Sequence, residues 1–238
     1  MPWRGVVALA RPRHSKAWAG LHRAARYGGF DVAPEDLLGE RIKPDLSKTS
    51  MQLAIEHEPE DLWVFGYGSL IWRPGFDHVE RVPARLIGAH RALCVFSHVH
   101  RGTPERPGLV LGLDLGGACR GIAYRVTAKQ RPETIAYLRG REQVTMVYRE
   151  TLRAVTLLAE PQRRVPALVY MIDRGHHQYA GRLDLATQLH LVRQGHGQSG
   201  PNREYVLSTV QALEALGLYD RDLHLLAERL RGTHEGHA

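Results

Sequence analysis

The chain has 238 residues, a formal net charge of +7 and a pI of about 9.7, and 43% of its residues are hydrophobic. This length predicts one domain with room for an extra segment, and the composition is that of a globular protein with a buried core. No apolar run approaches the roughly 20 residues that a bilayer-spanning helix needs, so we predict no membrane partner. Cys94 and Cys119 show neither metal nor redox spacing, and they suit a reducing cytoplasm.

The positive charge raises nucleic acid as a partner, but its distribution argues against that class. The arginines are scattered, and no basic residues alternate with exposed aromatic residues as a groove for single strands would need. A GC-rich coding bias explains the arginine-rich usage as well as a ligand does. We therefore predict no nucleic-acid partner. Of the 32 basic residues, the lysines are Lys16, Lys43, Lys48 and Lys129.

The first 60 residues differ in character from the rest of the chain. Residues 1–28 contain six Lys or Arg and no Asp or Glu, and "GVVALA" is too short for the apolar region of a secretory signal. Residues 29–60 are polar, with three prolines, and are typical of a linker. We predict that residues 1–60 form a basic N-terminal extension and linker that is poorly ordered, with a basic amphipathic arm as the alternative.

Strand-like segments begin at Leu62. The hydrophobic run "LWVFGY" predicts a buried strand, and further strands are expected at 84–97, 108–115, 119–126, 148–159 and 164–173. Between them, residues 131–142 predict a helix, with Pro132 suited to its first position and Ile135 and Leu138 on one face.

From residue 184 the pattern is helical. Three helices are expected, one ending at Gly195, one ending at Gly217, and a last one that Asp220 caps and Gly232 ends. Strands first and helices later predict an α+β domain over residues 61–232.

Several common catalytic motifs are missing. The chain has no G-x-S-x-G elbow and no P-loop, so Ser69 is not expected to be a nucleophile. His98 and His100, and the adjacent His176 and His177, lack a carboxylate or cysteine at ligand spacing. We predict neither a metal site nor a cofactor.

The segment "GYGSL" follows the first strand directly. Gly66 and Gly68 remove side chains where the backbone turns, which would expose consecutive N–H groups as a concavity for an anion such as a carboxylate. An ordinary turn at the end of a strand explains the same residues, and the sequence of this segment does not separate the two interpretations.

Glu142 is the acidic residue in the most unusual place. It lies at the end of the helix predicted over 131–142, where free carbonyl groups and the negative end of the helix dipole disfavour a carboxylate. Partial burial there would raise its pKa and make it a proton acceptor near neutral pH. The alternative is a solvated salt-bridge cluster in which Arg139 and Arg141 neutralise it.

Taken together in chain order, these segments resemble the ChaC family of glutathione-specific γ-glutamylcyclotransferases, and its bacterial branch in particular. The resemblance runs from about Trp63 to Leu230, and residues 1 to about 50 lie outside it. Eukaryotic relatives have a Gly-Gly pair soon after the glutamate, whereas Val144 and Thr145 occupy that region here. The segments that carry the resemblance are "VFGYGSLIW" (64–72), "HRALC" (90–94), "RGTPERPGLVLGL" (101–113), "GIAYRV" (121–126), "REQVTMVY" (141–148) and "GQSGPNREYV" (197–206).

The resemblance implies a fold, an activity and a set of residues. The fold would be a small, mixed, partly closed β-barrel with surrounding helices and a C-terminal helical stretch. The enzyme would be a cytoplasmic carbon–nitrogen lyase that cyclises the γ-glutamyl group of glutathione without a cofactor, releasing 5-oxoproline and Cys-Gly. Glu142 would be the catalytic residue. The residues implied to bind the substrate are Tyr67, Gly68, Ser69, Leu70, Arg91, Tyr148 and Tyr205.

Two alternatives remain open at this point. A cyclotransferase that acts on other γ-glutamyl amines or peptides would show the same loop and the same glutamate. A binding module that kept the fold without turnover is the alternative from another class, and the presence of Glu142 argues against it.

Overall fold

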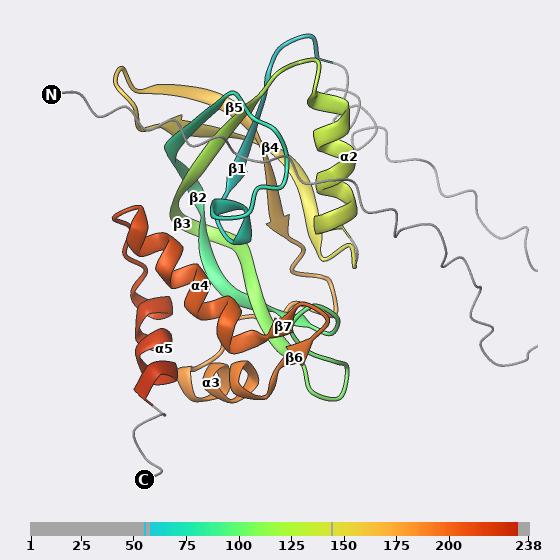
Figure 1. Ribbon diagram of the computed structural model, residues 1–238, viewed down its shortest axis with the longest axis vertical. Coiled ribbons are helices and arrows are strands. Elements are labelled where there is room, and N and C mark those ends of the chain that lie inside the picture. Colours follow the sequence, from blue (N-terminus) through green and yellow to red (C-terminus); the bar gives the residue numbers. More distant parts are fainter. Residues whose placement is uncertain (1–54, 56–57, 144, 233–238) are drawn as a thin grey trace, which may run out of the picture. The chain divides into compact units, whose positions relative to one another are not determined.

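Five strands close into a barrel in the computed structural model, which describes residues 55, 58–143 and 145–232 (Figure 1). Their order around the barrel is β1-β3-β2-β4-β5, and the parallel pairing of β1 with β5 completes the closure. The remaining strand pairs are antiparallel, so the barrel is mixed, as predicted, and it is fully rather than partly closed. The strands are β1 (Leu62–Gly66), β2 (Glu80–Ser97), β3 (Gly108–Val126), β4 (Tyr148–Leu157) and β5 (Arg163–Ile172). The extension predicted over residues 1–60 lies almost entirely outside the described residues, as does Val144.

The pair β2–β3 corrects one expectation. Two strands separated at Gly116 and Gly117 were predicted, but β3 is continuous through both glycines. They have φ angles of +94° and +70°, and the pairing shifts there, from Ala89 opposite Leu115 to Ile87 opposite Ala118. Glycine adopts positive φ without a steric penalty, so the strand absorbs the extra residues as a bulge instead of ending.

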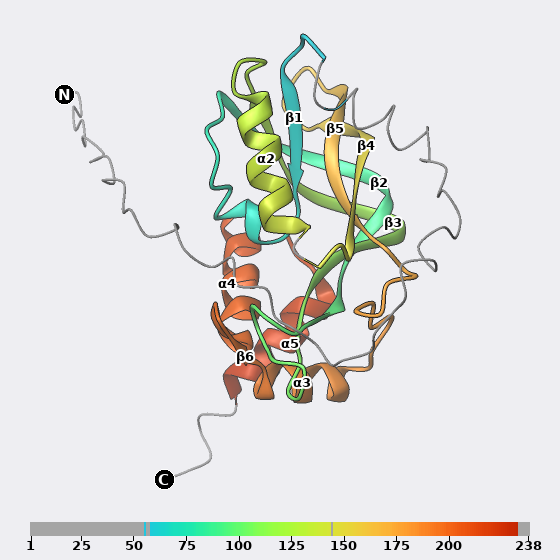
Figure 2. The same ribbon diagram turned by 90° about the vertical axis from the view of Figure 1, so that its right-hand side faces the viewer.

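The helices occupy two places around the barrel. Figures 1 and 2 show α2 alongside β1, whereas α3, α4 and α5 gather at one end of the barrel. Three predicted ends of the C-terminal helices are confirmed: Asp220 caps α5, and Gly195 and Gly232 follow the last residues of α3 and α5. Asp184, which was not predicted, caps α3. The elements are the 3-10 helix η2 (Ser69–Ile71), α2 (Arg131–Glu142), α3 (Leu185–Gln194), the short hairpin β6 (His196–Gly197) and β7 (Gly200–Pro201), α4 (Asn202–Ala215) and α5 (Arg221–Arg231).

Burial of β1 on both faces explains its uninterrupted hydrophobic sequence. Successive side chains of a strand point to opposite faces. Trp63 and Phe65 pack in the main core, which joins the barrel to α3, α4 and α5. Val64 packs in a second cluster with Ile135 and Leu138 of α2. The end of β1 is therefore held between the barrel core and α2, and the loop that follows begins from a fixed position.

Two side chains of α4 attach that helix to β3. Asn202, fully buried, accepts a hydrogen bond from the Leu109 N–H and donates one to the Leu109 carbonyl, both at 2.7 Å. One turn later, the Tyr205 hydroxyl accepts from the Leu111 N–H at 3.2 Å. Because the backbone of β3 is a rigid part of the barrel, Tyr205 is placed accurately beside it. Over the part of the chain that the structure describes, none of the helices combines the length and the apolar character needed to cross a bilayer.

Candidate active site

The loop after β1 turns tightly into η2. The Ile71 N–H donates to the Gly68 carbonyl and the Arg73 N–H donates to the Ser69 carbonyl, both at 2.9 Å. The first N–H groups of a helical turn have no acceptor within the turn. Accordingly, the N–H groups of Gly68, Ser69 and Leu70 have no acceptor among the described residues. The loop thus has the donors that the anion-binding interpretation requires.

The two glycines of the loop differ in what they allow. A Cβ atom on Gly66 would lie 3.0 Å from the Cβ of Leu70, so a larger residue there would require Leu70 to shift. A Cβ atom on Gly68 would meet nothing closer than Leu111 at 3.6 Å and the Tyr205 hydroxyl at 3.8 Å. Gly68 therefore leaves open a space that Leu111 and Tyr205 border, and a larger side chain would fill it.

Glu142 is the last residue of α2, as predicted. Its side chain is 17% exposed, and burial raises its pKa above the ordinary value, while the neighbouring Arg141 acts in the opposite direction. The cause is desolvation, which disfavours the charged carboxylate. The direction of this shift is the one expected of a general base, and the helix that carries Glu142 packs against β1 through Ile135 and Leu138.

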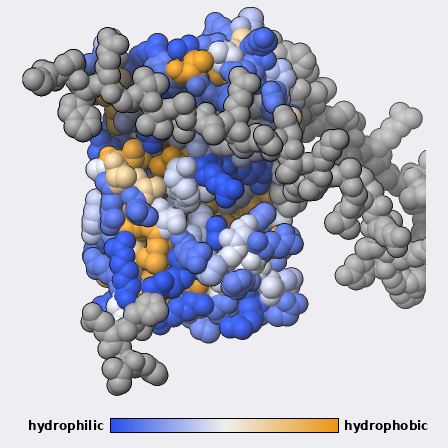
Figure 3. Space-filling view, viewed as in Figure 1, coloured by the Kyte–Doolittle hydropathy of each residue, from blue (hydrophilic) through white to orange (hydrophobic). Residues whose placement is uncertain are grey.

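Arg141 connects Glu142 to the loop. Its Nε lies 3.1 Å from the Glu142 Oε1, and its Nη2 donates to the Ser69 hydroxyl at 2.7 Å. Its Nη1 donates to the Arg73 carbonyl at 2.6 Å and to the Tyr137 hydroxyl at 3.1 Å. One guanidinium thus joins the carboxylate of α2 to the segment 69–73. Figure 3 shows hydrophilic side chains gathered beside the C-terminal end of α2, in contrast to the strip of hydrophobic side chains over α4 and α5.

The structure agrees only in part with the alternative interpretation, a solvated salt-bridge cluster around Glu142. Arg141 does pair with Glu142, but Arg139 binds Glu150 of β4 through Nη2 at 2.8 Å and Nε at 3.1 Å. Glu150 is buried and also accepts from the Tyr170 hydroxyl. Arg139 is therefore committed to anchoring α2 on β4.

The three predicted tyrosines lie within electrostatic range of Glu142. Burial raises the pKa of Tyr67 and of Tyr148 far above the ordinary value, and it raises that of Tyr205 to about 12. The negative charge of Glu142 contributes to each of these increases. The Tyr148 hydroxyl donates to the Leu111 carbonyl at 2.7 Å. Leu111 thus holds Tyr148 through its carbonyl and Tyr205 through its N–H.

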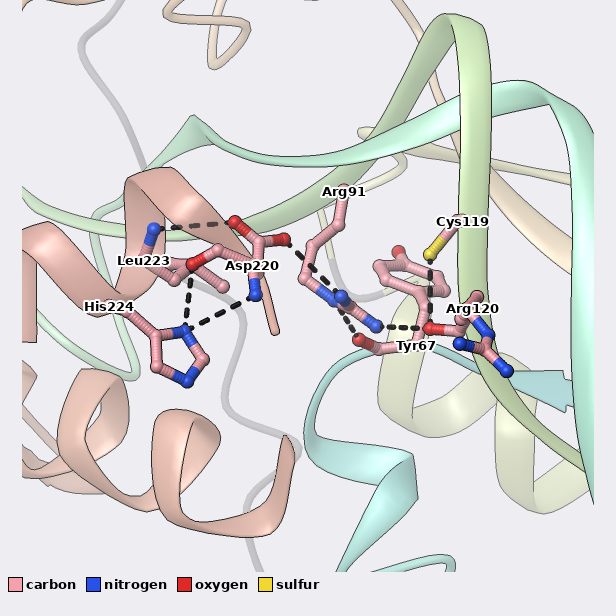
Figure 4. A network of polar contacts seen from close by, with 7 residues as sticks. All are labelled: Tyr67, Arg91, Cys119, Arg120, Asp220, Leu223 and His224. Carbon is pink, nitrogen blue, oxygen red and sulfur yellow. Dashed lines mark hydrogen bonds and ion pairs between the residues drawn. The ribbon is translucent and has the colours of Figure 1, made fainter. Parts of the chain in front are cut away.

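Arg91 contacts the loop 67–70 through the backbone carbonyl of Tyr67 (Figure 4). Its Nε donates to the Tyr67 carbonyl at 2.6 Å and its Nη2 to the Arg120 carbonyl at 2.7 Å. Its Nη1 binds the carboxylate of Asp220, the cap of α5, at 3.3 Å. The Arg91 side chain is 6% exposed. Every polar edge of this guanidinium contacts the protein, so Arg91 acts on the loop by fixing the Tyr67 carbonyl.

Other reactive side chains lie away from this arrangement. Cys94 and Cys119 are buried free thiols, and burial raises their pKa to about 12 and about 11. Both are therefore protonated at neutral pH and are poor nucleophiles. Within the described ranges, no three His, Cys, Asp or Glu side chains come together in a way that could hold a metal ion.

Comparison with known families decides the relationship of this chain. The model of a family described as "ChaC-like protein" matches residues 62–231. The chain belongs to the ChaC-like family. Its relatives include the glutathione-specific gamma-glutamylcyclotransferase of Escherichia coli (strain K12), which is 33% identical over 197 residues covering 82% of this chain and 83% of that protein. The resemblance to this family inferred from the sequence is therefore confirmed.

Relatives in eukaryotes match a somewhat shorter part of this ChaC-like chain. Human glutathione-specific gamma-glutamylcyclotransferase 1 is 33% identical over 177 residues, covering 71% of this chain and 78% of that protein. The protein named gamma-glutamylcyclotransferase 2-3 of Arabidopsis thaliana is 31% identical over 180 residues, covering 71% and 88%. The crystal structure of a yeast gamma-glutamylcyclotransferase specific to glutathione has a TM-score of 0.67 at 24% identity, covering 75% of this chain and 99% of that one. The ChaC-like barrel is thus the same fold.

Sequence reasoning did not identify several residues that hold this site together. Arg141 was considered only as a partner of Glu142, and its bond to Ser69 was not anticipated. Asp220 was expected only as a helix cap. Asn202 lies in the segment "GQSGPNREYV", and a polar residue one turn before Tyr205 was a signal that could have drawn attention to it.

Proposed function

We propose that this chain degrades glutathione by cyclising its γ-glutamyl group, releasing 5-oxoproline and Cys-Gly, as the names of its relatives in Escherichia coli and human indicate for those proteins. The observation that carries the proposal is Glu142, a carboxylate with a raised pKa at the end of α2, connected through Arg141 to the loop 67–70. Family membership and this geometry support the same chemistry.

The reaction is intramolecular. The α-amine of the glutamyl residue attacks its own γ-amide carbonyl, a new C–N bond closes a five-membered lactam, and the amide C–N bond to cysteine breaks. Because both reacting groups belong to one molecule, the protein mainly has to hold the reactive conformer. In this mechanism Glu142 takes the proton from the attacking amine and returns it to the nitrogen of the leaving Cys-Gly.

The loop 67–70 would bind the glutamyl end. The N–H groups of Gly68, Ser69 and Leu70 are available to the α-carboxylate or to the developing oxyanion, and such preorganised donors stabilise charge in a site from which water is excluded. Tyr67 contributes a buried ring, and its carbonyl is fixed by Arg91. Ser69 is committed to Arg141, which supports a binding role and argues against a nucleophilic one.

Tyr148 and Tyr205 would form the walls of the site. Their hydroxyl groups are tied to the backbone of Leu111, so the rings cannot turn away without breaking these bonds. Neither tyrosine ionises at neutral pH, since burial raises the pKa of both. Their contribution is to exclude water from Glu142 and to limit the conformations of the substrate.

A direct assay tests the proposal. Purified protein is incubated with glutathione, and both 5-oxoproline and Cys-Gly are quantified by chromatography. Equal amounts of the two products are expected. Release of glutamate in place of 5-oxoproline would indicate hydrolysis, and an absence of any product would overturn the assignment.

A second candidate is a cyclotransferase that acts on other γ-glutamyl amines or peptides. The name of the Arabidopsis thaliana relative does not mention glutathione. A panel that compares glutathione with γ-glutamyl-alanine separates the two. Turnover of γ-glutamyl-alanine at an equal or higher kcat/KM would favour the broader activity, and binding of glutathione without turnover would favour the non-catalytic module.

The catalytic domain in this proposal spans residues 61–232, with residues 1–60 as an extension. We place the reaction in the cytoplasm, where the two cysteines would stay reduced, in agreement with their burial as free thiols. Fractionation of cells that produce the protein, followed by the 5-oxoproline assay on each fraction, tests this placement.

A further inference from the structure

Arg101 lies next to the proposed active site and has no part in the mechanism above. It belongs to the loop between β2 and β3, is half-buried, and its guanidinium carbon lies 5.4 Å from the centroid of the Tyr205 ring. The Tyr205 hydroxyl lies 3.8 Å from the position that a Cβ atom on Gly68 would take. Tyr205 thus borders both the space beside Gly68 and the guanidinium of Arg101.

The Arg101 guanidinium is held by one of its nitrogens. Its Nη1 donates to the carbonyl of Ser199 and, at 3.3 Å, to that of Pro201, in the short hairpin before α4. This hairpin is itself bound to the Arg101 loop, since the Ser199 N–H donates to the His100 carbonyl at 2.9 Å. Among the described residues, none accepts from Nε or Nη2 of Arg101. The guanidinium of Arg101 is therefore held in place through Nη1, while the N–H groups of Nε and Nη2 are available to a ligand.

The charge around Arg101 is not balanced by a contact. No carboxylate of a described residue forms an ion pair with Arg101 or with Arg73, which follows the exposed Trp72. Burial lowers the pKa of Arg101, and the positive charge of Arg73 acts in the same direction, while Tyr205 and Glu204 oppose it. Two guanidinium groups within electrostatic range of each other create a positive potential that favours an anion.

We propose that Arg101 binds the carboxylate of the terminal glycine of glutathione, that the positive charge of Arg73 assists it, and that this contact gives the site its preference for glutathione. The inference rests on the proposed function, because it assumes that the glutamyl end occupies the loop 67–70. An extended chain of three residues spans about 10 Å. The separations from Gly68 to the Tyr205 hydroxyl and from the Tyr205 ring to Arg101 are compatible with that length. A planar guanidinium with free N–H groups matches a carboxylate in bidentate geometry.

The test compares glutathione with its glycinamide analogue, which has nearly the same size and lacks the terminal negative charge. The unaltered protein should favour glutathione. Arg101→Gln should lower kcat/KM for glutathione about 10- to 100-fold, chiefly through KM, as expected for loss of a hydrogen-bonded charge pair, and should leave the glycinamide value unchanged. Arg101→Lys keeps the charge without the planar fork and should give an intermediate preference.

Two further variants guard against a purely structural explanation. Arg106→Gln removes an exposed arginine from the same loop and should change neither substrate. Arg73→Gln changes an exposed side chain without disturbing the fold, and it should reduce the preference for glutathione by a smaller factor than Arg101→Gln. Calorimetric binding of both ligands to Glu142→Gln, with and without Arg101→Gln, gives the same comparison without turnover.

The outcomes separate this inference from the function on which it rests. Failure of the unaltered protein to release 5-oxoproline from either compound would overturn the proposed function. An active protein in which Arg101→Gln lowers both substrates equally, or changes neither, would overturn the carboxylate site alone and would assign Arg101 to the support of Tyr205. Selective loss of glutathione, in turnover and in binding, would establish the site.

Discussion

Replacing Arg141 by methionine tests how the base is positioned. The change keeps much of the side-chain length and removes both the 3.1 Å contact with Glu142 and the 2.7 Å hydrogen bond to Ser69. A hydrogen bond to a charged group contributes about 1.5–3 kcal/mol, so loss of the contact with Glu142 should lower kcat/KM by about 10- to 150-fold. Arg141 also favours the ionised form of Glu142. Without it, the pKa of Glu142 rises further.

The pH dependence follows from that direction. A general base must be deprotonated, so kcat/KM falls as the pH drops through the pKa of Glu142 in the free enzyme. Because that pKa rises in Arg141→Met, the acidic limb of the profile should move to higher pH. The tyrosines within electrostatic range of Glu142 are Tyr67, Tyr148, Tyr170 and Tyr205. Burial raises the pKa of each, so none of them replaces the lost positive charge.

The assay is initial-rate release of 5-oxoproline from glutathione between pH 5 and pH 9, with thermal unfolding measured on the same samples. Arg149→Met is the matched control. Arg149 is the second residue of β4, and its exposed side chain forms an ion pair with Asp173. Its profile should match that of the unaltered protein. An unmoved acidic limb in Arg141→Met, with a native melting curve, would refute the positioning role of Arg141.

Three other predictions concern the loop, its anchor and the domain boundary. Gly68→Leu should fill the space that Leu111 and Tyr205 border and raise the KM for glutathione at least about tenfold. Gly68→Ala should bind glutathione nearly normally, and equal KM values for the two variants would contradict a substrate in that space. Asp220→Asn should lower the free energy of unfolding by about 1.5–3 kcal/mol in urea titrations, because it removes one partner of Arg91. It should also raise KM with little change in kcat. An unchanged KM would show that the Asp220–Arg91 contact does not influence the loop. A form that begins at residue 61 should be less stable by at least about 3 kcal/mol than one that begins at residue 44, because buried Arg131 donates to the carbonyls of Ile55, Glu58 and Glu60. Equal denaturation midpoints of the two forms would contradict a stabilising role of these contacts.

Elements with strong local signals were predictable from the sequence. The hydrophobic run of β1, the Gly residues that follow α3 and α5 and the Asp220 cap of α5 depend on interactions within a few residues, and these were placed correctly. Pro132 was expected at the first position of α2 and is its second residue. The position of Glu142 at the end of α2 belongs to this class. Its raised pKa was expected from partial burial at the helix end, and burial is the cause in the structure.

Features that depend on distant contacts were not predictable in the same way. The continuity of β3 through Gly116 and Gly117 depends on its pairing with β2, so the glycines suggested a break where the strand has a bulge. Arg91 was expected to line the pocket, but its guanidinium is directed at backbone carbonyls and Asp220, contacts that require the folded barrel and α5. The bond from Arg141 to Ser69 likewise joins residues that only tertiary structure brings together.

Release of 5-oxoproline by Glu142→Gln measures the central claim most directly. The substitution keeps the size of the side chain and removes its ability to accept a proton, and Glu133→Gln, an exposed change at the start of the same helix, is the control. With Glu142 as the base, Glu142→Gln should fold and bind glutathione with near-normal affinity by calorimetry. Its kcat should fall by about 10²- to 10⁴-fold. The control should remain fully active. Substantial turnover by folded Glu142→Gln would contradict the account.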